Sequence, residues 1–175
     1  METSQLIPLI TAIVPSIIIG AVAYFFFKQY TETEAGKSRY RLHQENQKIA
    51  LPLRLQAYER LTLFTERMAI GALVTRVKAH SGDINAYANV LTASIDQEFE
   101  HNLAQQIYVS PGCWNVIRTA KNTTISIIRK TAQSENVSTS DELRETLLRD
   151  LLENTSPSDT ALSYIKNEIG EIMNI

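Results

Sequence analysis

The chain has 175 residues, of which 44% are apolar and 21% are charged, and its formal net charge is −2. This length suits one ordinary domain beside a short additional segment and is too short for two full domains. A single cysteine excludes an internal disulfide and every metal or redox motif that needs paired cysteines, and it suits a reducing compartment.

The first predicted element is a membrane-spanning helix over Leu6–Phe27, a segment without any charged residue. At about 1.5 Å per residue this helix is about 33 Å long, against a hydrocarbon core of about 30 Å. Ala21-Val22-Ala23 resembles a signal-peptidase site, but the preceding residues lack the positive charge that a cleavable signal needs. An anchor is therefore predicted, with residues 1–5 as a short periplasmic N-terminus.

Basic residues follow the apolar segment on one side only and set its predicted orientation. Residues 28–80 contain twice as many Lys and Arg as Asp and Glu, whereas acidic residues prevail over residues 81–175. The positive-inside rule places Met1 outside the inner membrane and the C-terminal domain in the cytoplasm. Residues 28–50 are predicted to form a polar, basic stalk that contacts anionic lipid headgroups. The cations assigned to these contacts are Lys28, Lys37, Arg39 and Arg41.

Residues 51–175 are predicted to form a bundle of about five amphipathic helices, which makes the fold all-α. Two long segments, Leu51–Val77 and Ile84–Ile107, carry apolar residues at helical steps of three and four. The first stripe comprises Leu51, Leu55, Tyr58, Leu61, Phe64, Met68, Ala72 and Leu73. The second comprises Ile84, Tyr87, Leu91, Ile95, Phe99, Leu103 and Ile107. Gly82 is expected to stop the first helix, and Asp83 to cap the second.

Capping sequences mark the starts of the remaining helices. Two Ser-Pro pairs each combine an N-cap with proline at the first helical position, and a Thr-x-x-Glu sequence after the polar loop Gln133–Ser138 fits a capping box. These sequences are Ser110-Pro111, Thr139 with Glu142, and Ser156-Pro157. The helix opened by the capping box presents Leu143, Leu147 and Leu151 on one face. The final helix presents Ala161, Leu162, Ile165, Ile169, Ile172 and Met173 as its apolar face.

The segment after Ser110 combines features of a helix and of a strand. Its predicted inward residues are Trp114, Ile117, Ile125 and Ile128. Thr123–Ile128 is β-branched and has strand propensity. A lone strand would have no partner in this chain, so a helix is predicted and a strand is the alternative.

Few residues suggest chemistry. Glu98 and His101 form one Glu-x-x-His pair, which is half of the pattern that holds two metal ions in helical bundles. The second half is absent and the chain has three histidines, so a solvated helix face is favoured over a metal site. Cys113 and Trp114 are predicted to be core residues at a helix start. No catalytic residue, metal or cofactor is predicted.

The strongest candidate for a partner-binding face lies on Glu98–Tyr108. There Phe99, Leu103 and Ile107 are predicted to face inward, which leaves charged and amide side chains on another face, where they could fix a partner's register. A second block, Leu51–Leu61, is similar in character. For the first block an ordinary solvated face is favoured over a partner-binding face. For the second block the alternative is core packing with Arg54, Glu59 and Arg60 on the surface. The predicted face comprises Glu98, His101, Asn102, Gln105, Arg54 and Glu59.

The strings LPLRLQAYERL and EFEHNLAQQIYVS, at Leu51–Leu61 and Glu98–Ser110, resemble an uncharacterised family of small membrane-anchored proteins of Bacteroidota. The resemblance also covers the apolar N-terminal segment, and so about the first two thirds of the chain. It implies a bacterial inner-membrane context and no catalytic residue, because no activity is established for that family.

The sequence thus predicts a membrane-tethered interaction module, either an adaptor or an accessory subunit of an inner-membrane assembly. Its predicted partners are the lipid bilayer and another membrane protein or a second copy of the chain. Nucleic acid is excluded by the acidic distal half. Two alternatives are a metal-binding or enzymatic bundle using the Glu98/His101 face, and a sensor of anionic lipid using the basic stalk.

Overall fold

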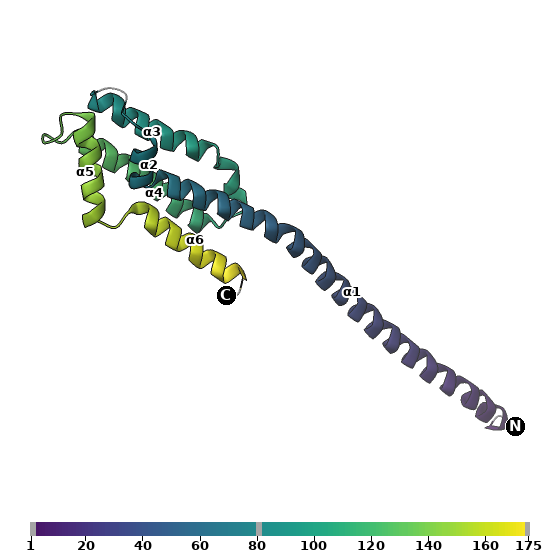
Figure 1. Ribbon diagram of the computed structural model, residues 1–175. Helices are drawn as coiled ribbons and strands as arrows, with labels where there is room; N and C mark the ends of the chain where they lie inside the picture. Colours follow the sequence, from purple (N-terminus) through teal and green to yellow (C-terminus); the bar gives the residue numbers. More distant parts are fainter. Residues whose placement is uncertain (1–2, 80–81, 174–175) are drawn as a thin grey trace. The chain divides into compact units, whose positions relative to one another are not determined.

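A computed structural model describes residues 3–79 and 82–173, with side chains for residues 15, 17–29, 48–79, 82–152 and 154–173. All regular structure in these ranges is helical, which confirms the predicted all-α class (Figure 1). The helices are α1 (Thr3–Met68), α2 (Ile70–Arg76), α3 (Ile84–Glu100), the 3₁₀ helix η1 (Leu103–Ile107), α4 (Pro111–Ala132), α5 (Ser140–Glu153) and α6 (Pro157–Met173). The chain divides into two compact units, Met1–Ala50 and Leu51–Ile175.

In the first unit, α1 carries a run of large apolar side chains that are exposed. Their exposed fractions lie between 56% for Ile18 and 68% for Ile19 and Phe25. The run comprises Ile17, Ile18, Ile19, Val22, Tyr24, Phe25, Phe26 and Phe27. Among the described residues, none of the helices combines the length and the apolar character that crossing a membrane requires. Within the predicted span Leu6–Phe27, the side chains of residues 6–14 and 16 lie outside those described.

The second unit is a helical bundle with one apolar core to which α1–α6 all contribute. Helix α4 packs against α3, α5 and α6, while α2 and α3 also pack against α5 (Figure 1). The largest fully buried side chains are Tyr58, Leu61, Phe64, Met68, Leu73, Leu91, Ile95, Ile117, Ile128, Leu143, Leu147 and Ile165. All of them belong to the apolar faces predicted above, because a helix brings residues three and four apart to one face.

The helix starts follow the predicted caps. The carboxylate of Asp83 accepts two backbone N–H groups in the first turn of α3. Ser110 Oγ accepts the N–H of Cys113 at 3.0 Å in the first turn of α4. Thr139 and Glu142 form the capping box of α5, in which each side chain accepts the other's backbone N–H. Thr123–Ile128 was predicted to be helical, with a strand as the alternative. It lies inside α4, which confirms the helix.

The first long helix ends earlier than predicted. The predicted helix over Leu51–Val77 is divided at Ala69, whose backbone is extended (φ −54°, ψ 131°) and separates α1 from α2. The chain changes direction there, and only part of the stripe beyond the turn stays buried, namely Leu73. Ala72, predicted to face inward, is exposed, and Leu51 at the other end of the stripe is also exposed, at 37%.

The second long helix also ends early. Helix α3 stops at Glu100, and the chain continues as η1, a tighter helix with about three residues per turn. Leu103 and Ile107 were predicted to face inward, and they are instead 41% and 74% exposed. The change from α to 3₁₀ geometry breaks the register on which their prediction depended. Met173, at the end of α6, is likewise 45% exposed rather than buried.

Candidate functional site

Two clusters of polar side chains join helices of the bundle. The Glu98 cluster consists of Arg67, Arg76, Glu98 and Asn102. The Glu168 cluster consists of Arg54, Tyr58, Ser110 and Glu168. Each brings together residues that are far apart in the sequence, so each depends on the fold.

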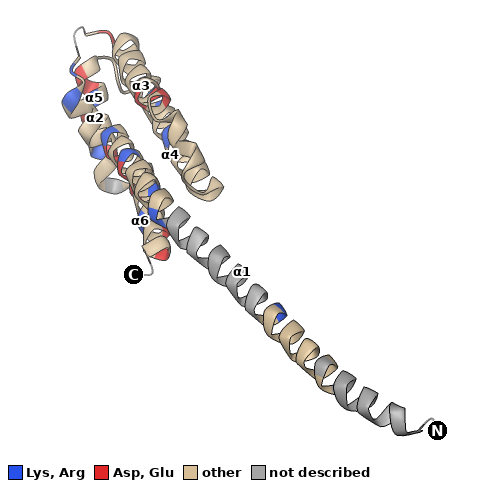
Figure 2. Cartoon of the chain, turned by 90° about the vertical axis from the view of Figure 1, so that its right-hand side faces the viewer, with Lys and Arg blue, Asp and Glu red and all other residues tan. Residues whose placement is uncertain are grey.

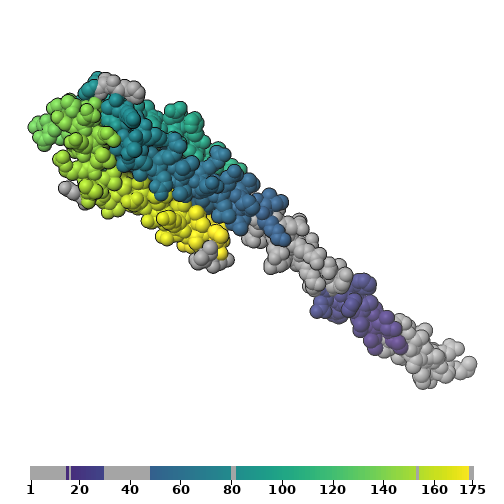
Figure 3. All heavy atoms as spheres, viewed as in Figure 1, coloured from purple at the N-terminus to yellow at the C-terminus, as the bar shows by residue number. Residues whose placement is uncertain are grey.

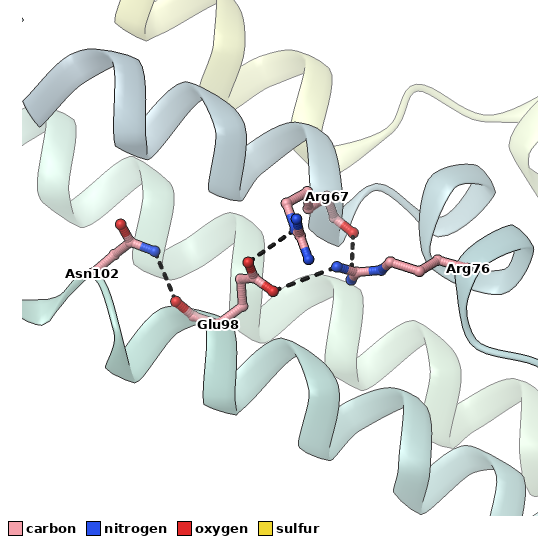
Figure 4. Close-up of polar contacts among 4 residues, drawn as sticks. All are labelled: Arg67, Arg76, Glu98 and Asn102. Carbon is pink, nitrogen blue, oxygen red and sulfur yellow. Dashed lines mark hydrogen bonds and ion pairs between the residues drawn. The ribbon is translucent and has the colours of Figure 1, made fainter. Parts of the chain in front are cut away.

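Glu98 on α3 is held by two arginines (Figure 4). Arg67 Nε lies 2.9 Å from one carboxylate oxygen, and an Arg76 nitrogen lies 3.4 Å from the other. Arg76 also donates to the carbonyl oxygen of Arg67 at 3.3 Å, near the point where α1 ends. The carboxylate thus joins α1, α2 and α3, and it stabilises the turn at Ala69.

The rest of the predicted partner-binding face is only partly assembled around Glu98. Asn102 donates to the carbonyl oxygen of Glu98 at 2.8 Å and so closes the end of α3. His101 is exposed and lines a pocket of about 420 Å³ together with Glu98 and the two arginines. Gln105 belongs to η1, beyond the end of α3. A partner for this face stays a prediction.

Arg54 and Glu59, the remaining members of the predicted face, lie on the bundle part of α1. Arg54 donates to the hydroxyl oxygen of Tyr58 at 3.5 Å, which places it in the Glu168 cluster, and its Nε donates to the carbonyl oxygen of Tyr108 at 3.1 Å. Glu59 is exposed.

Among the described residues, no group of three His, Cys, Asp or Glu side chains could hold a metal ion. The alternative of a metal site on the Glu98/His101 face thus gains no support from the described residues.

The predicted membrane-surface cations belong to the first unit. Lys28 is exposed on α1. The side chains of Lys37, Arg39 and Arg41 lie outside those described. Their contact with lipid headgroups stays a prediction.

Glu168 on α6 is the residue of this site that the sequence analysis missed. One carboxylate oxygen accepts the backbone N–H of Ser110 at 3.0 Å and the hydroxyl of Tyr58, and the other accepts Ser110 Oγ at 2.6 Å. The three donors come from α1 and from the start of α4. They hold α6 (yellow) against the bundle part of α1 (blue), as seen in Figure 3.

The environment keeps Glu168 ionised and Tyr58 protonated. Partial burial alone would raise the pKa of Glu168, but hydrogen bonds from Ser110 and Tyr58 and the charge of Arg54 outweigh it, so this pKa lies below its ordinary value. Burial, followed by the hydrogen bond to Glu168, raises the pKa of Tyr58 to about 12. At neutral pH the cluster therefore consists of a carboxylate with neutral hydroxyl donors and a nearby guanidinium.

Cys113 was predicted to be a core residue. It is fully buried in the first turn of α4, close to Glu168. Burial, followed by the negative charge of Glu168, raises the pKa of its thiol to about 12. A thiol in this state is protonated at neutral pH and lacks the thiolate that attacks substrates. Its prediction as a core residue is confirmed.

Replacing Glu168 with glutamine is expected to lower the free energy of unfolding at pH 7 by about 1 kcal/mol, because it removes a charge-assisted acceptor from a partly exposed network. The pKa of Glu168 is depressed in the folded state, so its stabilisation is present above the unfolded pKa and is lost as pH falls through the folded value. The wild type should therefore lose stability in acid more steeply than the variant. Urea unfolding of the full chain in detergent, from pH 7 to about pH 3, measures both effects.

The control for this prediction is Glu171→Gln, on the exposed neighbour of Glu168 in α6. This variant should keep the wild-type pH dependence. Equal acid sensitivity of all three proteins would show that the Glu168 carboxylate does not hold α6 in place.

A family model described as a family of unknown function (DUF7935) matches residues 4–172. The match is longer than the resemblance found from the two sequence blocks, since it includes the C-terminal third of the chain. No curated protein and no solved structure matches the chain.

Proposed function

Since this chain belongs to DUF7935, a family of unknown function, we propose from its own residues that it is a membrane-tethered interaction module, either an adaptor or an accessory subunit of a bacterial inner-membrane assembly. The apolar part of α1 anchors it, residues 28–50 give it reach, and the bundle binds the partner. The observation that carries this proposal is the uncharged segment Leu6–Phe27, whose described large side chains are exposed on α1.

The exposed apolar run supports the anchor on energetic grounds. A large aliphatic or aromatic side chain gains about 1.5–3 kcal/mol when it leaves water, and eight such side chains between Ile17 and Phe27 are more than half exposed. A bilayer removes them from water without requiring a protein partner. The cations that follow, beginning with Lys28, favour a cytoplasmic bundle by the positive-inside rule.

Two features of the bundle support binding rather than catalysis. The carboxylates of Glu98 and Glu168 are both engaged in contacts that hold helices together. The bundle also exposes large apolar side chains, with Leu63 at 57%, Ile107 at 74% and Leu152 at 89%. Exposed apolar residues on a well-packed domain are candidates for protein contact.

The proposal is tested by crosslinking in native membranes, followed by gentle solubilisation, affinity purification of the full chain and mass spectrometry. We expect crosslinks from the bundle to one defined membrane protein or to a second copy of the chain. The matched control is the full chain purified without crosslinker. A chain recovered from membranes without any crosslinked partner would contradict the interaction role, and a chain recovered in the aqueous fraction would contradict the anchor.

A further inference from the structure

The bundle has an open groove between α4 and the start of α6, which we term the α4–α6 groove. Its volume is about 410 Å³, and its lining residues are all uncharged. Val116, Ala120 and Pro157 contribute apolar surface, and exposed threonines, Thr119 and Thr123 among them, form its edges. Small side chains at helical spacing leave room for a large apolar side chain from outside.

An apolar side chain of suitable size protrudes beside this groove. Leu152, at the end of α5, is 89% exposed, which is the highest value among the large apolar residues described. Leu148, one turn earlier, is 37% exposed. Thr155 lines the groove three residues after Leu152, so at most about 11 Å of extended chain separates the two features. The molecule thus carries a protruding leucine and an apolar groove close together.

The charges on the two helices are complementary. The stripe that contains Thr119 and Thr123 continues along α4 to Lys130, and α4 contains basic but no acidic residues. Helix α5 holds five acidic residues and two arginines, Arg144 and Arg149. Its stripe that contains Leu152 and Leu148 leads back to Glu145 and Asp141, with Arg144 beside them. Lys130, Glu145 and Asp141 are all exposed. Figure 2 colours Lys and Arg blue and Asp and Glu red along the described helices.

The two stripes also match in length. Thr119 and Lys130 are 11 positions apart on α4, as are Asp141 and Leu152 on α5, which corresponds to about 16 Å in each helix. If two such helices lie antiparallel with Leu152 over Thr119, Asp141 lies level with Lys130. Glu145 is then one turn from the same ammonium group. Apolar and charged contacts can therefore form together.

We propose that a second copy of this chain occupies the α4–α6 groove. Leu152 and Leu148 of each copy enter the groove of the other, and Lys130 of each copy pairs with Glu145 and Asp141 of the other. A protrusion and a groove on one face can satisfy each other reciprocally about a twofold axis. The inference rests on the proposed function, because it names the partner of the interaction module, and tethering to one membrane would favour such a pair by raising the effective concentration.

The first test uses two differently tagged full-length chains expressed together in membranes, one with Thr119→Cys and one with Leu152→Cys. Mild oxidation should yield a covalent heterodimer at least five times more abundant than in a control pair in which Val90→Cys replaces Leu152→Cys. Val90 is 48% exposed on α3, away from α4 and α5 in sequence. The buried Cys113 contributes no competing exposed thiol. A heterodimer yield equal to that of the control would overturn the proposal.

The second test reverses the charges in the same pair of chains. Lys130→Glu or Glu145→Lys alone should lower the heterodimer yield at least threefold, and the two changes together should restore it. Loss of yield in the single variants without recovery in the combination would overturn the pairing.

If the heterodimer is absent while the bundle still crosslinks to a different membrane protein, this inference fails and the proposed function stands. If the heterodimer forms in a chain that leaves the membrane on alkaline washing, the proposed anchor fails and this inference stands.

Discussion

A chain in which Ile18 and Val22 are both replaced by arginine is expected to move from the membrane pellet to the soluble fraction. Both side chains are exposed in the apolar part of α1, at 56% and 63%, and both lie within Leu6–Phe27. Each arginine near the middle of a membrane span disfavours insertion by about 2.5–3.5 kcal/mol. Two together should lower the insertion equilibrium by about 1,000-fold or more. Immunoblots of pellet and supernatant after ultracentrifugation measure the shift.

The matched control for the double-arginine chain replaces the same two residues with leucine. This chain keeps the length and apolar character of the segment, so it should stay in the pellet and be released by mild detergent. Retention of the double-arginine chain in a detergent-soluble pellet, to the same extent as the leucine control, would show that this segment does not anchor the protein.

Replacing Phe99 with alanine is expected to lower the free energy of unfolding by about 3–5 kcal/mol. The ring is 9% exposed and stacks on Trp114, with 5.2 Å between ring centroids. It also packs at a tilt against Phe64 at 5.6 Å, and the ammonium group of Lys121 lies 4.8 Å from its centroid. Alanine would leave a cavity where α1, α3 and α4 meet. Urea unfolding of the full chain in detergent, followed by circular dichroism, measures the loss.

Ile107→Ala provides the comparison for Phe99→Ala. Ile107 was predicted to lie on the same inward stripe, but it is 74% exposed in η1. Its truncation should therefore change the free energy of unfolding by less than about 0.5 kcal/mol. A loss for Ile107→Ala as large as that for Phe99→Ala would mean that α3 continues through residue 107 and that the stripe predicted from the sequence is correct.

The parts of the fold that were predicted depend on local chemistry. Tyr58, Leu61, Leu91 and Ile95 are buried because apolar residues at helical spacing share one face. The start of α3 at Asp83 was predictable because a side-chain acceptor there satisfies backbone N–H groups that a helix start leaves free. Neither inference needs knowledge of a distant residue.

The end of α1 could not be predicted, because it depends on contacts across the bundle. The turn at Ala69 is stabilised by Arg76, which bridges the carbonyl oxygen of Arg67 and the carboxylate of Glu98. Glu98 was recognised as a polar residue of interest, but its two arginine partners lie 22 and 31 positions earlier in the chain. The sequence pattern shows that such a residue is polar, but it does not identify the residues that contact it.

Glu168 was missed for the same reason. It lies between Ile165 and Ile169, so the available signal was an acidic residue beside the apolar stripe of the last helix. That position is common on solvated helices and does not indicate a partner. The donors that hold it, Tyr58 and Ser110, come from other helices at 110 and 58 positions of separation.

The central claim is that residues 6–27 anchor the chain and that the bundle lies in the cytoplasm. Protease protection, combined with an alkaline wash, tests it most directly. We predict that the full chain stays in membranes washed at high pH, and that protease digests the bundle in inverted inner-membrane vesicles but not in intact spheroplasts. Release of the full chain by the wash without detergent, or digestion of the bundle by protease added to intact spheroplasts, would contradict the account.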